Sequence, residues 1–346
     1  MADTVSTKRF TRRAFLATLA AAPFAAYGAP PVRDPTFTVL SLFRPQRLNL
    51  YATSEPLAIL LDDKRITLHA GECLTIDAAG GGIDVGHSVV ERLAVRSTTA
   101  FAVEVPDKLR RNYLATLAID SNGGHLRCVV GIERELAVAS IVAAESPPHT
   151  TPNALAAQAI AARSFLLGAA TAHVGADFCD TTHCQFLREP PGSGSRFIQA
   201  AQRTKGLVLQ YRSPVDVSPA TLAAMYSRSC GGRTRTLAEL GLPSRGYPYY
   251  AVACAFCRAH PELWQRDLVT PTAASERSRL EYNRIHGWSA LPGHADSTTA
   301  FTIKGRGIGH GLGLCQLGAA NMAARGAAFA EILTHYYPNT TLVRVA

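Results

Sequence analysis

A break made of two prolines constrains the fold of this chain more than any other feature of its sequence. The residues before it, 133–144, carry apolar side chains at helical spacing, which predicts a helix with one buried face. Pro147 and Pro148 cannot continue that helix, so it should end at about Glu145. A carboxylate at a helix C-terminus opposes the helix dipole, and an apolar environment would raise its pKa further. Glu145 is therefore a candidate proton donor, although an isolated Glu at a frayed helix end is more often only solvated.

A second helix is predicted directly after the break. It should begin after residues 151–153 (Thr-Pro-Asn), and its Ala-rich sequence extends to about Ala172. Gln158 and Arg163 lie five residues apart on it, so they do not share one face well. Arg163 stands among Ala and Phe, which favours either a structural ion pair or a clamp on a substrate rather than free solvation.

A cluster of two thiols and two imidazoles follows this helix. His173, Cys179, His183 and Cys184 lie within twelve residues and have the ligand types of a tetrahedral zinc site. The spacing differs from that of a zinc finger, because two of the ligands are adjacent and need a bent backbone to reach one ion. A Cys179–Cys184 disulfide is the alternative. If all four side chains bind, the ion is closed and structural, with no open position for water.

The rest of the chain is predicted to mix strands with short helices. Residues 30–110 contain short apolar runs divided by turn signals, and residues 112–130 form a hairpin with an Asn-Gly-Gly turn. Residues 196–235 should form strand, turn and strand. A helix is expected before Pro338, and a short strand after it. The predicted class is α+β, with mixed helices and short antiparallel sheets and a small N-terminal β module at 30–110.

Two glycine-containing segments carry further candidate site residues. Gly231 and Gly232 bend the chain after Y-S-R-S-C, so Tyr226 and Ser229 precede a tight turn and are suited to contact substrate hydroxyls; an ordinary strand end is the alternative. In G-R-G-I-G-H-G-L-G-L-C-Q the glycines alternate, but the acidic residue and βαβ unit of a dinucleotide-binding loop are missing. Alternating glycines favour a backbone that approaches another surface closely, with His310 presented at its centre.

The remaining cysteines leave several pairings open. The chain has eight cysteines, and the connectivity of Cys73, Cys128, Cys230, Cys254, Cys257 and Cys315 cannot be deduced from the sequence. The C-x-x-C formed by Cys254 and Cys257 could be a disulfide, a redox pair, or half of a second metal site with Cys230 or His260. Because no thioredoxin-like βαβ frame surrounds it, a structural link is favoured over redox catalysis.

The N-terminus has the pattern of a removable export signal. Residues 8–29 have a basic start, an apolar run and a small-residue end. Arg12 and Arg13 in T-R-R-A-F-L resemble a twin-arginine signal, which carries folded proteins. A general secretory signal and an uncleaved anchor are the alternatives, but the apolar run is too short for a stable membrane span. We predict a signal peptide at 1–29 and a periplasmic or extracytoplasmic protein with no stable membrane span after cleavage.

Charge and export together restrict the partners. The formal net charge is +9, and removing residues 1–29 takes away four basic residues and one acidic residue, which leaves about +6. This mildly basic surface suits an acidic partner such as a cell-wall polymer. We find no aromatic-rich basic cluster, so no nucleic-acid partner is expected. Folding before export would also allow zinc to load in the reducing cytoplasm.

Several motifs together resemble one family. The stretches A-A-E-S-P-P, A-L-A-A-Q-A-I-A-A-R-S-F, C-D-T-T-H-C-Q, Y-S-R-S-C-G-G-R-T, G-R-G-I-G-H-G-L-G-L-C-Q-L-G-A and H-Y-Y-P-N-T follow one another in this order. They resemble the sporulation stage II protein D family (SpoIID/LytB), whose members cleave peptidoglycan or enhance cell-wall amidases. The resemblance covers roughly residues 112–346. It implies that a domain at 111–346 folds around a glycan-binding groove.

The resemblance implies a lytic transglycosylase with a single acid. Glu145 matches the acid that protonates the MurNAc–GlcNAc glycosidic oxygen and then deprotonates the C6 hydroxyl, giving a 1,6-anhydro end. The His/Cys cluster matches a structural zinc site of the family. The sequence departs from the family pattern at Ser146, Ala156 and Ser227-Arg228, where Met, Lys and His-Ser are usual. The substrate-binding candidates are Gln158, Arg163, Tyr226, Ser229 and His310.

Two other functions fit the same residues. The protein could be a non-catalytic, glycan-binding enhancer of a cell-wall amidase, and the departure at Ala156 keeps this alternative open. It could also be a zinc hydrolase, which would need an open coordination position on the metal.

Overall fold

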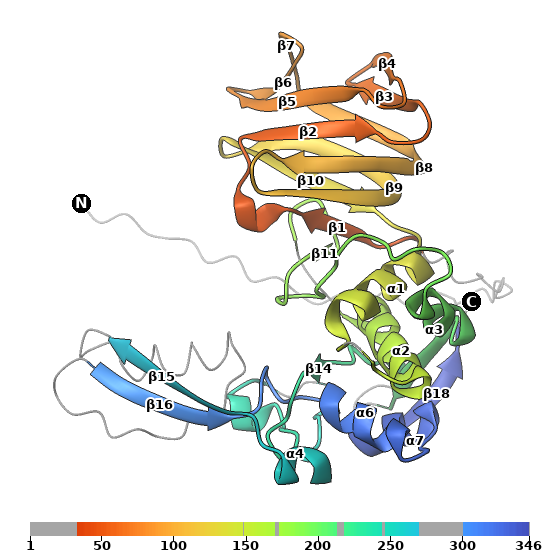
Figure 1. Cartoon of the computed structure of the whole chain (residues 1–346), viewed down its shortest axis with the longest axis vertical. Coiled ribbons are helices and arrows are strands. Elements are labelled where there is room, and N and C mark those ends of the chain that lie inside the picture. The colour runs from red at the N-terminus through yellow and green to blue at the C-terminus, as the bar shows by residue number, and fades with distance from the viewer. Residues whose placement is uncertain are drawn as a thin grey trace, which may run out of the picture. The chain divides into compact units, whose positions relative to one another are not determined.

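The computed structural model describes residues 33–147, 149–169, 173–212, 218–243, 246–269 and 300–345. The predicted signal peptide at 1–29 lies outside these residues, and residues 34–346 form one compact unit. Helices and antiparallel strands occur together, which confirms the predicted α+β class (Figure 1). Within the described part of the chain, no helix combines the length and apolar character needed to cross a membrane.

One large sheet contains most of the N-terminal half. Its strands alternate between buried and more exposed positions, as in the pattern of β10, so one face of each strand enters the core. The sheet order is β11-β1-β10-β9-β8-β2-β5-β6-β7, and β3 joins β4 to β8. The strands are β1 (Thr36–Val39), β2 (Arg47–Ala52), β3 (Leu57–Leu61), β4 (Lys64–Leu68), β5 (Cys73–Ala79), β6 (Gly82–Val85), β7 (Ser88–Val90), β8 (Arg92–Val105), β9 (Leu109–Asn122), β10 (His125–Gly131) and β11 (Phe178–Cys179).

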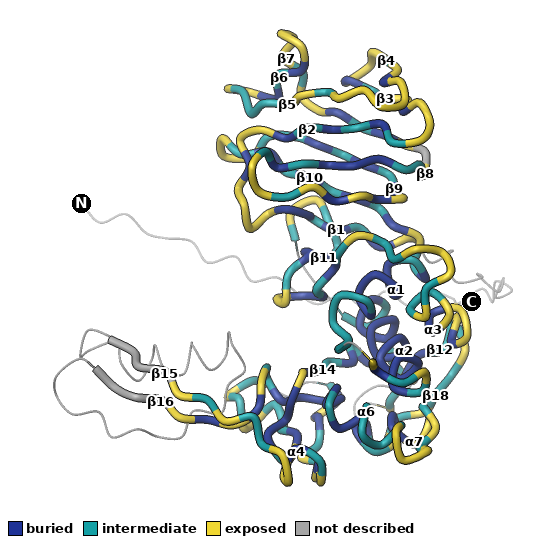
Figure 2. Tube along the Cα trace, viewed as in Figure 1, coloured by how far each residue is buried: buried dark blue, intermediate teal, exposed yellow. Residues whose placement is uncertain are grey.

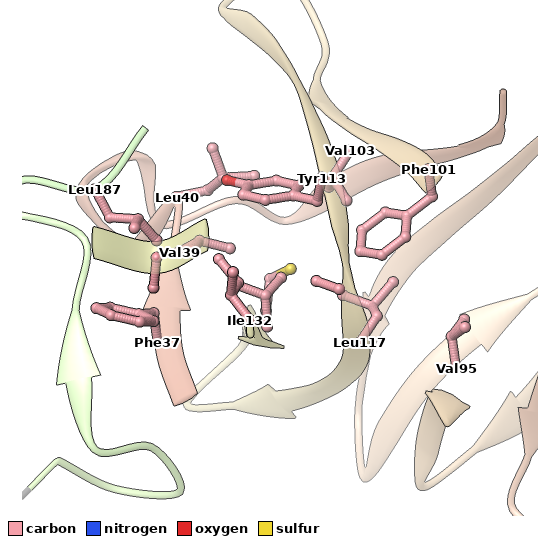
Figure 3. Packing of buried hydrophobic residues seen from close by; sticks show 14 of the residues in the cluster. Phe37, Val39, Leu40, Val95, Phe101, Val103, Tyr113, Leu117, Ile132 and Leu187 are labelled. Carbon is pink, nitrogen blue, oxygen red and sulfur yellow. The ribbon is translucent and has the colours of Figure 1, made fainter. Parts of the chain in front are cut away.

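The expected hairpin and the expected domain boundary both fall in this sheet. Strands β9 and β10 pair with Asn122 opposite His125, and Gly123 and Gly124 form the turn at positive φ, as predicted. The N-terminal module was expected to end at residue 110, and this residue lies within β9, which pairs with β8. Figure 3 shows part of the core, in which side chains from β1, β8 and β9 pack with Ile132 and Leu187. The boundary itself stays a prediction.

Two helices, α1 and α2, follow β10. Helix α1 (Arg134–Glu145) begins where the Glu133 side chain accepts a hydrogen bond from the Leu136 N–H at 2.8 Å, and it ends directly before the proline break, as predicted. Helix α2 (Pro152–Gly168) ends four residues before the predicted Ala172, which lies outside the described residues. Both helices are largely buried (Figure 2).

The region predicted as strand, turn and strand differs in its first part. Residues 196–203 form helix α3 (Arg196–Arg203) instead, because the Ser195 hydroxyl accepts a hydrogen bond from the Ile198 N–H and caps its start. The strand predicted next is present as β12 (Leu207–Tyr211), which lies between β13 (Ala220–Thr221) and β18 (Thr340–Arg344). Residues 196–203 were assigned to a strand because they were grouped with the strand-forming sequence that follows them.

The C-terminal half is built on a second core, rich in tyrosine, that includes Tyr336 and Tyr337. The predicted helix before Pro338 and the strand after it are confirmed as α7 and β18. A short parallel pair of strands, in which Tyr226 is opposite Leu314, lies where this core meets the first one. The remaining elements are β14 (Tyr226–Ser227), α4 (Ala255–Ala259), β15 (Leu263–Val269), β16 (Ala300–Arg306), β17 (Leu314–Cys315), α6 (Gln316–Ala324), α7 (Phe329–Tyr336) and two short 3-10 helices, η1 (Ser41–Phe43) and η2 (Ala238–Leu240).

Candidate active site

A cavity of about 370 Å³ opens at the C-terminal end of α1, and Glu145 is part of its wall. Five other parts of the chain complete the lining: Phe165 of α2, residues 182–186 after the His/Cys cluster, residues 225–228 around β14, residues 308–310 of the glycine-rich segment, and Gln316 at the start of α6. Every one of these lining residues is described by the structure, and Glu145 is the only carboxylate among them. The cavity therefore presents one acid.

The surroundings of Glu145 keep its carboxyl group protonated to a higher pH than usual. Burial raises its pKa from 4.5 to about 7, and a hydrogen bond from the Phe186 N–H to Oε1, at 3.2 Å, opposes the rise. The Gln316 side chain donates to the backbone carbonyl of Glu145 at 3.1 Å and so ties the end of α1 to α6. A carboxyl with this pKa can both give and take a proton near neutral pH.

Tyr226 and His310 line the same cavity as neutral groups. The Tyr226 hydroxyl donates to the Gln185 side-chain oxygen, and its pKa is raised by burial and, to a lesser extent, by the charge of Glu145. Burial lowers the pKa of His310 to about 4, although its hydrogen bond with the backbone of Tyr226 acts in the opposite direction. The His310 Nδ1 accepts from the Leu312 N–H at 3.0 Å. The imidazole is therefore fixed and uncharged at neutral pH.

The alternating glycines explain how His310 reaches the cavity. The predicted close approach is confirmed at Gly313, where φ is +62° and an added Cβ would lie 2.1 Å from the Met225 carbonyl oxygen. At Gly309, with φ of +94°, an added Cβ would lie 2.9 Å from the Ser227 Cβ. Any side chain at these positions would push the segment away from β14.

Arg163 does not line the cavity. Its guanidinium is fully buried and forms an ion pair with Glu135 of α1, with the Arg163 Nε 2.9 Å from Oε1. It also donates to the backbone carbonyls of Leu207 at 3.0 Å and Ala201 at 3.1 Å. Of the two roles that the sequence allowed for Arg163, the structure shows the ion pair, and its contacts hold α1, α2, α3 and β12 together. This placement does not support Arg163 as a glycan contact.

Two other substrate-binding candidates lie behind the cavity wall. Ser229 is 1% exposed and its hydroxyl donates to the Cys257 sulfur at 3.6 Å. Gln158 is 2% exposed, and among the described residues neither polar atom of its amide has a hydrogen-bond partner within 3.5 Å. Its amide lies near the Tyr226 hydroxyl and slightly lowers the pKa of that tyrosine. Neither residue is among those lining the cavity.

The four residues of the predicted metal cluster come together. One ligand atom from each of His173, Cys179, His183 and Cys184 can be chosen so that all four lie within 4.8 Å of one another. The His173 Nε2 is 2.9 Å and the His183 Nδ1 is 3.4 Å from the Cys184 sulfur. Ligand bonds of about 2.0–2.3 Å place tetrahedral ligand atoms roughly 3.3–3.8 Å apart, so the donor set fits a zinc ion. Both cysteines are free thiols rather than a disulfide.

The cluster is held against the large sheet and forms part of the cavity wall. Strand β11, which contains Cys179, pairs in parallel with β1. The neighbouring Asp180 forms a buried ion pair with Arg111 of β9 at 2.8 Å and accepts from the Leu40 N–H at 3.1 Å. On the other side of the cluster, His183 and Cys184 line the cavity. The cluster therefore fixes the segment whose Phe186 N–H contacts Glu145.

Several polar residues of the cavity were not candidates from the sequence, among them Gln185, Gln316 and Arg228. Gln185 and Gln316 each follow a cysteine, and each side chain holds another residue of the wall. Arg228 also lines the cavity, with its exposed side chain 3.7 Å from Glu262. The repeated Cys-Gln pair was a signal that could have identified the first two. Arg228 was noted only as a departure from the family pattern.

Comparison with known proteins agrees with the motifs. Residues 122–211 match the family model described as Stage II sporulation protein, SpoIID. The stage II sporulation protein D of Bacillus subtilis (strain 168) is 26% identical over 275 residues, which cover 62% of this chain and 75% of that protein. The amidase enhancer of the same organism is 49% identical over 45 residues, which cover 13% of this chain and only 6% of that protein. The predicted family resemblance is confirmed.

Proposed function

We propose, from its similarity to the SpoIID/LytB family, that this chain is a peptidoglycan lytic transglycosylase with Glu145 as its general acid and base. The family supports a role in cell-wall processing. The observation that carries the finer proposal is the single carboxyl group of the cavity, with its pKa near neutrality. Hydrolases that activate water on a sugar use two carboxylates, whereas an intramolecular attack needs only one group.

In the proposed reaction Glu145 first donates a proton and then accepts another. As a neutral acid it protonates the glycosidic oxygen between MurNAc and GlcNAc, and the C1–oxygen bond breaks. As a carboxylate it then takes the proton of the MurNAc C6 hydroxyl, whose oxygen bonds to C1. The products are a 1,6-anhydro end and a free GlcNAc hydroxyl, so no water is consumed. Tyr226 and His310, which line the cavity as neutral groups, are suited to contact sugar hydroxyls.

We further propose that the His173, Cys179, His183 and Cys184 cluster holds a structural zinc ion. With four protein ligands the ion has no open position, so it supplies rigidity and no nucleophile. Its effect would be on the position of residues 182–186 and hence on the Phe186 N–H that contacts Glu145. A closed site of this kind argues against the zinc-hydrolase alternative.

The proposal is tested by incubating purified protein with peptidoglycan and measuring released fragments. Glu145→Gln should abolish release, because the amide cannot donate the proton. Glu55→Gln, a substitution of an exposed glutamate in the loop between β2 and β3, serves as the matched control and should keep full activity. Release by Glu145→Gln at the rate of the parent protein would refute the mechanism.

The similarity to the amidase enhancer supports a second candidate function. A non-catalytic, glycan-binding enhancer would release nothing alone and would accelerate a purified cell-wall amidase. Glu145→Gln would leave that acceleration intact. Measuring amidase product with and without each variant separates this function from the first.

We also propose that the protein is exported through the twin-arginine signal at residues 1–29. This follows from Arg12 and Arg13 and their apolar run. Replacing both arginines by lysine should retain the protein in the cytoplasm, as fractionation of cells would show. Unchanged export would favour a general secretory signal.

A further inference from the structure

A second cluster of metal-ligating side chains lies in the C-terminal half. One sulfur from each of Cys230, Cys254, Cys257 and Cys315 lies within 4.8 Å of every other, and all four residues are buried. They come from three separate segments: the turn after β14, the start of α4, and the junction of β17 and α6. Figure 1 shows α4 and α6 as separate elements of this half.

Neighbouring donors point at three of the four sulfurs. The Ser229 hydroxyl donates to the Cys257 sulfur, and the Tyr336 hydroxyl donates to the Cys254 sulfur at 3.5 Å. The Cys315 sulfur accepts from the backbone N–H groups of Cys230 and Gly318, both at 3.4 Å. Hydrogen bonds donated to sulfur stabilise thiolates and are the usual outer shell of thiolate-bound metals.

The chain packs closely around the cluster at Gly318. At Gly318 in α6, an added Cβ would lie 1.9 Å from the Tyr336 hydroxyl and 2.6 Å from the Cys254 sulfur. Glycine at this helical position therefore lets Cys254 and its hydrogen-bonding partner approach α6 directly. Gly231 and Gly232, at φ +69° and +126°, allow the chain to turn immediately after Cys230.

The sulfur spacing favours a metal over disulfides. The sulfurs of Cys257 and Cys315 are 3.4 Å apart, whereas a disulfide bond is about 2.0 Å long. Four thiolates around zinc, with bonds of about 2.3 Å, lie roughly 3.8 Å from one another. Four cysteines are also one of the closed donor sets that hold structural zinc.

We propose that Cys230, Cys254, Cys257 and Cys315 bind one structural zinc ion as a closed Cys₄ site. The site adjoins a part of the cavity wall that the His/Cys cluster does not supply. Ser227 of β14 is opposite Cys315 in the parallel pair, and Cys315 directly precedes Gln316. A zinc ion there would fix the wall that carries Tyr226, Arg228 and Gln316. The two metal clusters would then hold two different parts of the cavity wall around Glu145.

Metal analysis of the full chain purified from a reducing cytoplasm tests this proposal independently of any enzymatic activity. Elemental analysis should find two zinc ions per chain. Cys257→Ser and His183→Ala should each lower the content to one. Cys128→Ser, which removes a buried thiol outside both clusters, is the matched control and should keep two.

Zinc X-ray absorption keeps the test decisive even if a variant fails to fold. Two occupied sites predict an average of three sulfur and one nitrogen ligands per zinc in the unaltered protein, because one site offers four sulfurs and the other two sulfurs with two nitrogens. One zinc per chain with two sulfurs and two nitrogens would overturn the proposal. So would peptide mapping of that protein showing Cys254, Cys257, Cys230 and Cys315 as two disulfides.

Discussion

Replacing Glu145 by Gln should make the protein more stable at alkaline pH while it removes activity. The folded protein holds the pKa of this carboxyl at about 7, above its ordinary value of 4.5. The folded state therefore binds the proton more tightly than the unfolded chain. Its contribution to stability is complete below pH 4.5 and is lost as the pH rises through 7. Glutamine is neutral at every pH, so the variant escapes this loss.

The size of the effect follows from the pKa. At about 1.4 kcal/mol for each pKa unit, ionising Glu145 in a fully buried site would remove roughly 3 kcal/mol of folding free energy. Because the side chain is only partly buried at a cavity wall, we expect about 1–2 kcal/mol. The Gln side-chain oxygen can still accept the Phe186 N–H, so little is lost in exchange.

Urea unfolding at pH 5 and pH 8.5 measures the difference. The variant and the parent protein should be close in stability at pH 5, and the variant should be more stable by about 1–2 kcal/mol at pH 8.5. Glu55→Gln should show no comparable pH-dependent gain. The reasoning about a desolvated acid is refuted if the advantage of Glu145→Gln is absent at pH 8.5 or equally large at pH 5.

Three further substitutions test the packing of the site. Arg163→Ala should destabilise the protein by about 3–5 kcal/mol because it leaves a buried carboxylate unpaired. Arg233→Ala, at an exposed ion pair, should cost less than about 1 kcal/mol. Lost activity at unchanged stability would instead make Arg163 a substrate contact. Gly313→Ala should be at least twice as destabilising in thermal unfolding as Gly326→Ala, since both have positive φ but only the first places a Cβ against backbone; equal effects would argue against the close approach. Tyr226→Phe should slow glycan release by roughly tenfold, because one buried hydrogen bond is worth about 1–2 kcal/mol; an unchanged rate would remove the hydroxyl from the account.

Local rules were enough to predict the features that depend on neighbouring residues. Pro147 ends α1 at Glu145, and the Asn-Gly-Gly turn joins β9 to β10, because each is decided by backbone geometry within a few residues. The alternating glycines similarly indicated close backbone contact, which Gly313 makes. Helix α3 was missed although its eight residues are strongly amphipathic at helical spacing, because it is short and was grouped with the strand-forming sequence of β12 that follows it.

Partners that are distant in sequence were beyond prediction. Arg163 pairs with Glu135, 28 residues earlier, and nothing in the Ala-rich helix indicates that choice over a substrate. Cys315 lies 58 residues after Cys257, so the sequence could propose a second metal site without identifying its full ligand set. The fold supplies both by bringing together segments that are distant in sequence.

The most direct measurement of the central claim is the source of the oxygen at the new sugar end. Peptide-free glycan strands are cleaved by the purified protein in water enriched in oxygen-18, and the fragments are weighed by mass spectrometry. Attack by the C6 hydroxyl predicts MurNAc ends that lack one water and carry no oxygen-18. Reducing ends that contain one oxygen-18 atom would show that water is the nucleophile and would contradict a mechanism with one carboxyl group.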